Sequence, residues 1–404
     1  MKGFLLFSTI KMLAVFTMVM VGVALLTLME RKVAGWFQNR PGPNRVGPWG
    51  ILQPAADGVK NFLKEETRPA TAHQALFILA PAMSFVPAVS LMAVIPLAAP
   101  LPMSVDWTLP LIGRVVYQGA MPMAVADLPI GFLFVLAISS MGVYGVALAG
   151  WSSNSKYSLL GGLRAAAQMV SYEVAMGLSL IPVLLMSGNV TFGSVIAQQQ
   201  AGLWYVGPLF LSFFVFLIAG FAETNRLPFD LPEAESELVA GYHSEYSAMK
   251  FSMFYIAEYA HIVTISAMLA TLFFGGWDIP FTSWDEQGGV LQTLATHAAF
   301  FAKMFFWIFF VMWIRWTLPR FRYDQLMALG WKVLLPISLG YVMVTATALW
   351  VLDQFLPTAS PVMRSGALFA MNLVLAVILF WGLDSGRVVR GVGPRVALRS
   401  RMEA

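Results

Sequence analysis

The sequence contains no cysteine, and this absence excludes several kinds of site. Without a thiol, the 404-residue chain can form no disulfide, no Cys-ligated iron–sulfur cluster and no Cys-type zinc site. Histidine is almost as rare, and the four that occur are scattered, with no HExxH spacing: His73, His243, His261 and His297. We therefore expect no metal site on this chain, and we expect any redox cofactor that works with it to be bound by another polypeptide.

Charged residues are also scarce. They make up 11% of the chain, whereas about a quarter is usual in a soluble globular protein. Hydrophobic residues reach 58% and the mean hydropathy is +0.72. The 31 Phe, 13 Trp and 11 Tyr suit contact with lipid tails and headgroups. This composition predicts an all-α integral membrane protein.

Nine apolar runs are long enough to cross a bilayer, which takes about 20 residues for a hydrocarbon core about 30 Å thick. They are, approximately, 5–28, 76–99, 127–149, 166–187, 203–222, 251–276, 298–318, 333–352 and 366–383. If the N-terminus lies outside, the first, third, fifth and seventh connections between spans and the C-terminal tail all lie on the cytoplasmic side. These segments carry 20 of the 25 Lys and Arg residues. The positive-inside rule therefore predicts a multi-pass protein of the cell (inner) membrane, with its N-terminus outside and its C-terminus cytoplasmic. The outer connections are expected to be inert.

The first cytoplasmic connection combines a rigid turn with a predicted amphipathic helix. Three Pro and two Gly within residues 40–48 favour a turn. Apolar residues then recur at helical spacing over 51–66, which predicts a short helix lying along the membrane interface. This helix is either an ordinary surface helix with snorkelling lysines, or one wall of an entrance for an amphiphile, with Arg31, Arg40 and Asp57 near its mouth.

The third cytoplasmic connection, 223–250, is unusually acidic. Five of the chain's 21 carboxylates occur within 15 residues: Glu223, Asp230, Glu233, Glu235 and Glu237. A helix N-terminus accounts for part of this pattern. Asp230 and Glu233 have capping-box spacing, and acids in a first turn complement the helix dipole by roughly 0.3–1 kcal/mol each. This explanation does not cover Glu223 or Glu237.

Two acids lie within predicted spans, Glu173 and Glu258, and Asp127 begins another. An ionised acid at the bilayer centre costs roughly 2.5–3.5 kcal/mol even on the lenient scale, so such residues usually face a bundle interior or a wet cavity. One interpretation is structural, namely an interhelical hydrogen bond from a protonated acid. The other is a proton relay, because neighbouring carboxylates in a low dielectric titrate as a coupled set.

Several motifs, in order along the chain, carry a family resemblance. They are Gly42-Pro43-Asn44, Gln53-Pro54 followed by Ala56-Asp57, Arg164-Ala165 followed by Ala167-Gln168, Ser171-Tyr172-Glu173, the acidic stretch from Glu223 to Val239, and the run from Pro319 to Met327. Together they resemble the H-type membrane subunit of respiratory complex I, the proton-pumping NADH:quinone oxidoreductase, whose mitochondrial counterpart is subunit 1. The resemblance runs from the first span to the eighth.

The resemblance implies an eight-span core, to which this chain adds a ninth span and a basic tail. We expect residues 1–365 to form one membrane domain and residues 366–404 to form the extra span and tail. In that family the subunit joins the membrane arm to the peripheral arm, and it forms much of the tunnel through which a quinone reaches the terminal iron–sulfur cluster.

The quinone, ubiquinone or menaquinone, is then a substrate, and the resemblance implies no flavin, haem or iron–sulfur cluster on this chain. Expected partners are membrane lipid and the other complex I subunits: the peripheral iron–sulfur and quinone-site subunits, the small membrane subunits and the antiporter-like subunits. No nucleic acid is expected.

The resemblance also assigns roles to individual residues. Those near the quinone tunnel or its mouth are Arg31, Arg40, Asp57, Phe229 and Arg315. Those of the acidic funnel, which leads from the quinone chamber towards the antiporter-like subunits, are Glu173, Glu223, Asp230, Glu233, Glu235, Glu237 and Glu258, with Asp127 as a further member.

Two other interpretations stay open. The chain could be the homologous membrane subunit of an energy-converting hydrogenase or a related dehydrogenase, or it could be a stand-alone proton or solute transporter. The full tunnel-side loop weighs against the hydrogenase. The concentration of acids at one face, without broken helices in repeated halves, weighs against the transporter. Within a complex, the acidic loop could also serve as a docking surface.

Overall fold

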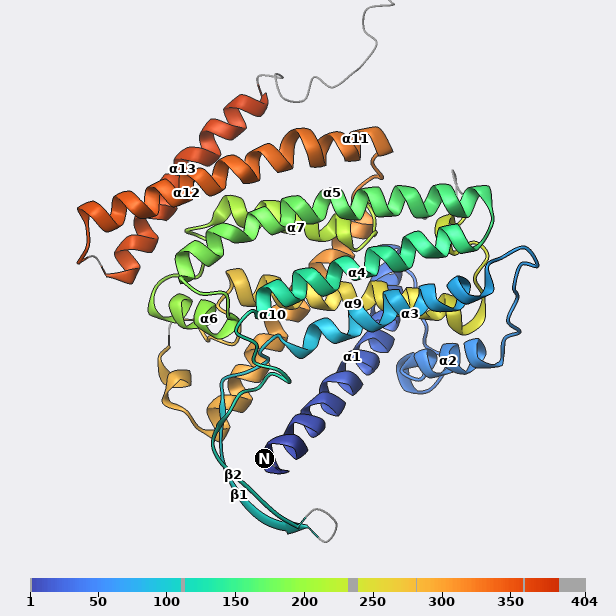
Figure 1. Ribbon diagram of the computed structural model, residues 1–404, viewed down its shortest axis with the longest axis horizontal. Coiled ribbons are helices and arrows are strands. Elements are labelled where there is room, and N and C mark those ends of the chain that lie inside the picture. The colour runs from blue at the N-terminus through green and yellow to red at the C-terminus, as the bar shows by residue number, and fades with distance from the viewer. Residues whose placement is uncertain (1, 110–112, 232–238, 281, 359, 385–404) are drawn as a thin grey trace, which may run out of the picture.

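A computed structural model describes residues 2–109, 113–231, 239–280, 282–358 and 360–384, and these residues are mostly helical (Figure 1). The helices are α1 (Lys2–Phe37), α2 (Gln53–Leu63), α3 (Gln74–Ser90), α4 (Gly131–Ser152), α5 (Lys156–Ser187), α6 (Phe192–Ala201), α7 (Phe210–Glu223), α9 (Ala248–Phe273), α10 (Val290–Thr317), α11 (Tyr323–Ala328), α12 (Leu335–Phe355) and α13 (Pro361–Asp384). A π-helical turn, Leu329–Leu334, joins α11 to α12. Short 3-10 turns lie at Pro48–Gly50, Leu91–Ala93, Gly241–His243 and Trp284–Gln287.

Within the described residues, eight helices are long and apolar enough to cross a membrane, which confirms the predicted all-α membrane fold. The remaining predicted span, 203–222, corresponds to α7, which has only 14 residues. Proline has no N–H to donate and disfavours helical backbone in the residue before it. Pro208 therefore keeps the preceding segment out of the helix, and α7 begins at Phe210.

The helices α3, α4, α5 and α12 lie side by side in one row (Figure 1), and nearly every residue of the most apolar part of α9 is buried. Glycine permits the closest approach between α4 and α5. A Cβ on Gly150 would lie 2.5 Å from the Ser158 carbonyl oxygen and 3.0 Å from the Gly162 Cα. Small residues at such crossings let membrane helices pack backbone to backbone.

A β-hairpin occupies one of the connections that were expected to be inert. Strands β1 (Leu101–Leu109) and β2 (Gly113–Met121) pair antiparallel, with Leu101 opposite Met121. Val105 and Val115 are buried and pack with Phe7 at the start of α1. The sequence does carry a period-2 signal over 103–108, where apolar and polar residues alternate, and the prediction missed it. We call this end of the bundle the hairpin end.

The predicted amphipathic helix is confirmed as α2. None of its residues is buried, and its apolar side chains Val59, Phe62 and Leu63 are exposed. It lies against α1 and α9. We call the end of the bundle that carries α2 and the connection 224–247 the loop end. Most of the predicted site residues lie between the middle of the bundle and this end.

Candidate functional site

The acid at the end of α7 is buried among three other helices. Glu223 is 6% exposed and accepts a hydrogen bond from the Ser139 hydroxyl of α4. Its second oxygen, Oε2, is buried and has no hydrogen-bond partner in the described part of the chain. His261 of α9 lines the same two small cavities as Glu223. Glu173 of α5 is close enough to interact electrostatically with Glu223, so the structure brings these two predicted acids together.

A second acid, Glu258 of α9, forms a buried ion pair. Its Oε2 lies 3.0 Å from Nη2 of Arg226, and the two side chains are only 11% and 5% exposed. The Tyr242 hydroxyl donates a 3.0 Å hydrogen bond to the other carboxylate oxygen. The guanidinium of Arg226 also lies over the Tyr259 ring, 4.5 Å from its centroid. Both oxygens of Glu258 are thus engaged, as a buried charge requires.

Gln168 of α5 holds the turn that carries Arg226 from α7 to α9. Its side-chain amide donates to the carbonyl oxygens of Ala222, at 2.8 Å, and Phe229, at 2.9 Å, and to Asn225 Oδ1, at 3.2 Å. The bonds to Ala222 and Phe229 satisfy two backbone carbonyl groups that a turn inside a bundle would otherwise leave unpaired. One buried amide therefore holds the turn over residues 222–229.

The network extends to α1 and α10 through Glu30. This residue is 6% exposed. It forms an ion pair with Arg315 of α10 and accepts a hydrogen bond from the Tyr259 hydroxyl. The Tyr259 hydroxyl also lies 3.1 Å from that of Tyr255. Arg315 is therefore connected through Glu30 and Tyr259 to the Arg226 guanidinium.

A small cavity separates the two buried acids. Its volume is about 20 Å³, and Glu223 and Glu258 both line it, together with Asn225, Tyr242 and His261. A cavity of this size with several polar groups has room for about one water molecule. Two acidic residues from different helices therefore line the same cavity.

Arg31 and Asp57 form an ion pair that joins α1 to α2. Arg31 Nη1 lies 2.8 Å from Asp57 Oδ2, and the side chains are 49% and 33% exposed. Gln53 donates a 3.1 Å hydrogen bond to the other oxygen of Asp57. Because Arg31 directly follows Glu30, this partly exposed pair borders the buried network at the loop end.

The other predicted residues of this region lie around the network. Phe229 is buried and stacks on Phe321, and Asp230 pairs with Arg320 at 3.1 Å. Arg40 is exposed, and its guanidinium bonds to a neighbouring glutamine in the turn after α1. Three predicted acids fall outside the described residues: Glu233, Glu235 and Glu237.

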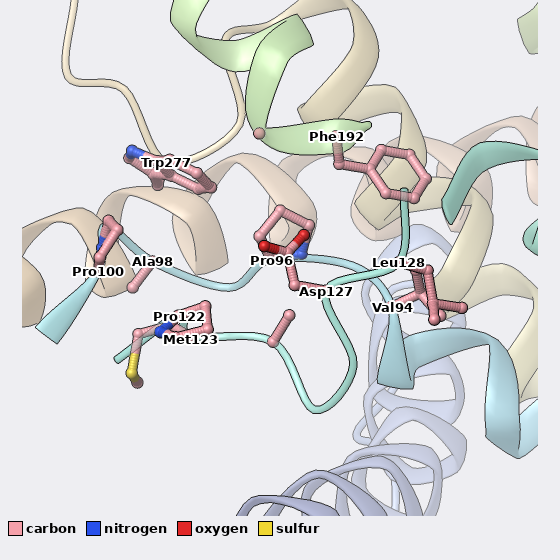
Figure 2. Close-up of a pocket in the computed structure, with 12 residues that line it drawn as sticks. Val94, Pro96, Ala98, Pro100, Pro122, Met123, Asp127, Leu128, Phe192 and Trp277 are labelled. Atoms are coloured by element: carbon pink, nitrogen blue, oxygen red, sulfur yellow. The ribbon is translucent and has the colours of Figure 1, made fainter. Parts of the chain in front are cut away.

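Asp127 lies apart from these acids, at the hairpin end. It lines a cavity of about 120 Å³ together with Pro96, Phe192 and Trp277, which Figure 2 labels. It interacts electrostatically with Lys11 of α1. Asp127 precedes the first residue of α4, Gly131. Glu223 is hydrogen-bonded to Ser139 of α4, which lies eight residues, or about 12 Å, further along that helix. The structure does not join Asp127 to the cluster.

A set of contacts ties the connection between α2 and α3 to the start of α9. Glu66 pairs with Arg68, at 2.9 Å, and with Lys250. The backbone N–H of Thr67 donates a 2.9 Å hydrogen bond to Ser247 Oγ. The hydrogen bonds from Arg68 and Lys250 favour the ionised carboxylate, and they hold the pKa of Glu66 below its usual value.

The sequence prediction missed part of the network. Glu30 lies just past the predicted first span, 5–28, but α1 continues beyond it to Phe37. A signal was present, since Leu26, Glu30 and Val33 share one helical face and all three are buried. No comparable signal marked the hydroxyl and imidazole groups that surround the acids: Ser139, Tyr242, Tyr259 and His261.

Comparisons with known proteins place these residues in a wider context. A model of the family described as NADH dehydrogenase matches residues 10–346. An H-type subunit of the NADH-quinone oxidoreductase of Koribacter versatilis is 49% identical over 85% of this chain and 97% of its own length. The H-type subunit of the Magnetococcus marinus enzyme is 46% identical over 87% of this chain and 93% of its own length. NADH-ubiquinone oxidoreductase chain 1 of Chondrus crispus is 48% identical over 84% of this chain and 95% of its own length.

Proposed function

Because the chain belongs to the NADH dehydrogenase family, which includes the H-type subunits of NADH-quinone oxidoreductase, we propose that it forms the quinone-access tunnel of that complex and couples quinone reduction to proton translocation. The chain itself carries out no redox step in this proposal. It shelters the quinone, ubiquinone or menaquinone, and it responds to the charge that reduction creates. Flavin and iron–sulfur clusters belong to partner subunits.

The tunnel mouth in this proposal lies at the loop end, beside α1, α2 and α10. The exposed apolar side chains of α2 offer a surface to an isoprenoid tail, and the Arg31–Asp57 pair beside them offers polar groups to a headgroup. Arg315 connects this region to the interior through Glu30. A change of charge at the mouth can therefore reach the buried acids through ion pairs, without a long-range rearrangement.

The proton path in this proposal starts at the Arg226–Glu258 pair. From Glu258 it crosses the small cavity to Glu223, and from Glu223 it reaches Glu173. One water molecule in the cavity would complete the hydrogen-bonded connection. Moving a proton against 100 mV requires about 2.3 kcal/mol, which equals a relative pKa change of under two units between donor and acceptor. Buried coupled carboxylates reach changes of that size.

The observation that carries this proposal is the shared cavity, because it gives two acids from separate helices a common polar contact. The wider arrangement follows the family. Residues 1–365 form the membrane domain that holds chamber and funnel. The N-terminus lies outside, and the loop end faces the cytoplasm, where the peripheral iron–sulfur and quinone-site subunits bind. The small membrane subunits and antiporter-like subunits lie beside it in the membrane.

The direct test replaces Glu223 by Gln in the intact complex. The glutamine keeps the size of the side chain and can still accept the Ser139 hydrogen bond, so folding should be retained while the titratable proton is lost. We expect quinone-dependent NADH oxidation, or the proton yield per NADH, to fall at least about tenfold, which corresponds to about 1.4 kcal/mol. Both quantities are measured in sealed proteoliposomes.

The matched control is Asp353→Asn, at the exposed end of α12, where the acid pairs with Arg364 in solvent. It should leave both quantities unchanged. Whether the iron–sulfur subunits co-purify with the variant distinguishes a role of Glu223 in proton coupling from a role in binding those subunits. If Glu223→Gln loses those subunits, the acidic region serves assembly. If it keeps them and also keeps wild-type rates and proton yield, the relay is wrong.

A further inference from the structure

The groove between α12 and α13 is separate from the network described above. Its volume is about 530 Å³, and it lies along α12 between the π-helical turn and Val344, with Leu375 and Ile378 of α13 on the opposite side. Figure 1 places both helices at one edge of the bundle. The helix α13 follows the residues that the family model matches, so the groove exists only because the chain continues past them.

The groove is apolar along its length. Pro336, Ile337, Gly340 and Val344 form its α12 wall. Val344 and Ile378 are 37% and 55% exposed, so the groove opens to its surroundings rather than being enclosed in the core. Its volume lies within the range of about 300–1,000 Å³ that is usual for small-molecule sites. An elongated hydrocarbon fits such a site, and a folded polar ligand does not.

The length of the groove matches one leaflet of a bilayer. From Lys332 to Val344 the chain advances 12 residues, or about 18 Å at 1.5 Å per residue. Half of a hydrocarbon core about 30 Å thick is about 15 Å. A single acyl chain that starts at Lys332 would therefore fill the groove and end near the bilayer middle.

A positive charge marks one end of the groove. Lys332 lines it, is exposed, and forms no hydrogen bond or ion pair with any other residue that the structure describes. The adjacent Trp331 donates its indole N–H to Ser171 Oγ at 2.9 Å, which anchors the turn that bears Lys332. A lone ammonium group at the end of an acyl-length groove complements a lipid phosphate with net negative charge.

We propose that this groove binds an anionic phospholipid, with one acyl chain between α12 and α13 and the headgroup phosphate at Lys332. The helix α13 packs against α6 and α7, so it supplies the outer wall while the bundle supplies the inner one. The lipid fills the space that residues of both helices line. The added helix thus creates a lipid site on the edge of the bundle.

The test uses a photoreactive phosphatidylglycerol with a diazirine midway along one acyl chain, and a phosphatidylcholine probe with the same chains. Each is added to the intact complex purified in detergent, and labelled peptides are mapped by mass spectrometry after illumination. Phosphatidylglycerol should label α12 and α13 peptides of the wild type. Phosphatidylcholine should label them about fivefold less, because one lysine near a phosphate contributes about 1 kcal/mol.

Two variants alter the groove itself. Gly340→Leu adds a side chain to the groove lining, at a position where a Cβ meets no atom within 4 Å, and it should remove most of the labelling. Gly366→Leu, at an equally unobstructed glycine of α13 outside the groove lining, is its control. Lys332→Gln should lower phosphatidylglycerol labelling about fivefold, whereas Lys332→Arg, and Lys156→Gln at another exposed lysine, should keep it.

Three results would overturn the proposal. The first is equal labelling by both probes, which denies the charge preference. The second is labelling that persists in Gly340→Leu. The third is the absence of labelling in the wild type, as when another subunit covers the groove. If Gly340→Leu fails to assemble, Lys332→Gln and Lys332→Arg still test the proposal, because both changes lie at the exposed end of the groove. Equal labelling of these two variants would contradict it.

Discussion

Arg226 is buried and Lys303 is half-buried within the same bundle, and the groups to which they donate differ in kind. Arg226 is paired with a carboxylate, Glu258, on another helix. Lys303 of α10 instead donates to three backbone carbonyl oxygens, those of Phe274, Gly276 and Asp278, at 2.7, 3.0 and 2.6 Å. The carboxylates of Asp278 and Asp285 interact with it electrostatically, but the structure shows no hydrogen bond from Lys303 to either of them among the described residues. The two residues show that a basic side chain inside a membrane bundle can either hold backbone groups in place or pair with a titratable acid.

The group that accepts from the basic side chain determines whether a proton can be passed on. A backbone carbonyl cannot take up a proton, so the contacts of Lys303 stabilise the end of α9 and the turn after it, where the helix dipole also favours a cation. A carboxylate can exchange a proton with a neighbour, and Glu258 shares a cavity with Glu223. A charge withdrawn from solvent therefore does not by itself indicate a proton path. The proposed path also requires a hydrogen-bonded or ion-paired carboxylate that lines a cavity with another acid.

The largest expected effect is on stability, at the hairpin end. Lys303→Met removes three hydrogen bonds to a charged group, and it should lower the free energy of unfolding by about 3 kcal/mol or more. The measurement is thermal inactivation of the purified complex. The fraction that assembles should still pump with the wild-type proton yield. A stable but uncoupled variant would show that Lys303 belongs to the path and would remove the contrast with Arg226.

A comparable effect on stability, because Arg226 loses a buried partner, and a specific effect on coupling are expected for Glu258→Gln. The amide oxygen can keep the Tyr242 hydrogen bond, but the ion pair with Arg226 and the titratable proton are lost. The proton yield should fall roughly tenfold, or about 1.4 kcal/mol. Tyr242→Phe, which removes only one hydrogen bond worth about 1 kcal/mol, should reduce it about fivefold. Wild-type proton yield in Glu258→Gln would mean that the buried pair is structural, like Lys303.

A minor effect is expected for Asp127→Asn. The residue lies at the hairpin end, before the start of α4, and the described structure does not connect it to Glu223. The rate of quinone-dependent NADH oxidation should change less than about twofold, the scale of a weak exposed interaction. A loss as large as that of Glu223→Gln would place Asp127 on the path and extend the relay to both ends of the bundle.

The smallest effect is expected for Glu66→Gln, which weakens the contact between the α2–α3 connection and α9. An exposed ion pair contributes about 0.5 kcal/mol, so hydrogen exchange of residues 64–73 should quicken about twofold. The pKa of Glu66 is lowered in the folded state. Its contribution is therefore present above the unfolded pKa, about 4.3, and is lost as the pH falls through the lower folded value. The variant should show no such acid-dependent change.

The spans and the family were predictable from the sequence, because they depend on the length of apolar runs and on local motifs. The late start of α7 depends on Pro208, which is a local signal that could have been used. The site was predictable only in part. Glu173 and Glu258 were identified as acids within predicted spans, and Glu223 as part of the acidic connection. The contacts that link Glu30 to Arg315 and Tyr259, however, join residues more than two hundred positions apart. A single sequence does not show which helix faces pack together.

The central claim is that quinone reduction changes the protonation of the buried acids. The most direct measurement is infrared difference spectroscopy of the reconstituted complex, oxidised against reduced, in the region of the protonated carboxyl C=O stretch. The wild type should give a difference band that shifts in heavy water, and Glu223→Gln and Glu258→Gln should each remove part of it, while Asp353→Asn removes none. A band that is unchanged in both glutamine variants would contradict the relay.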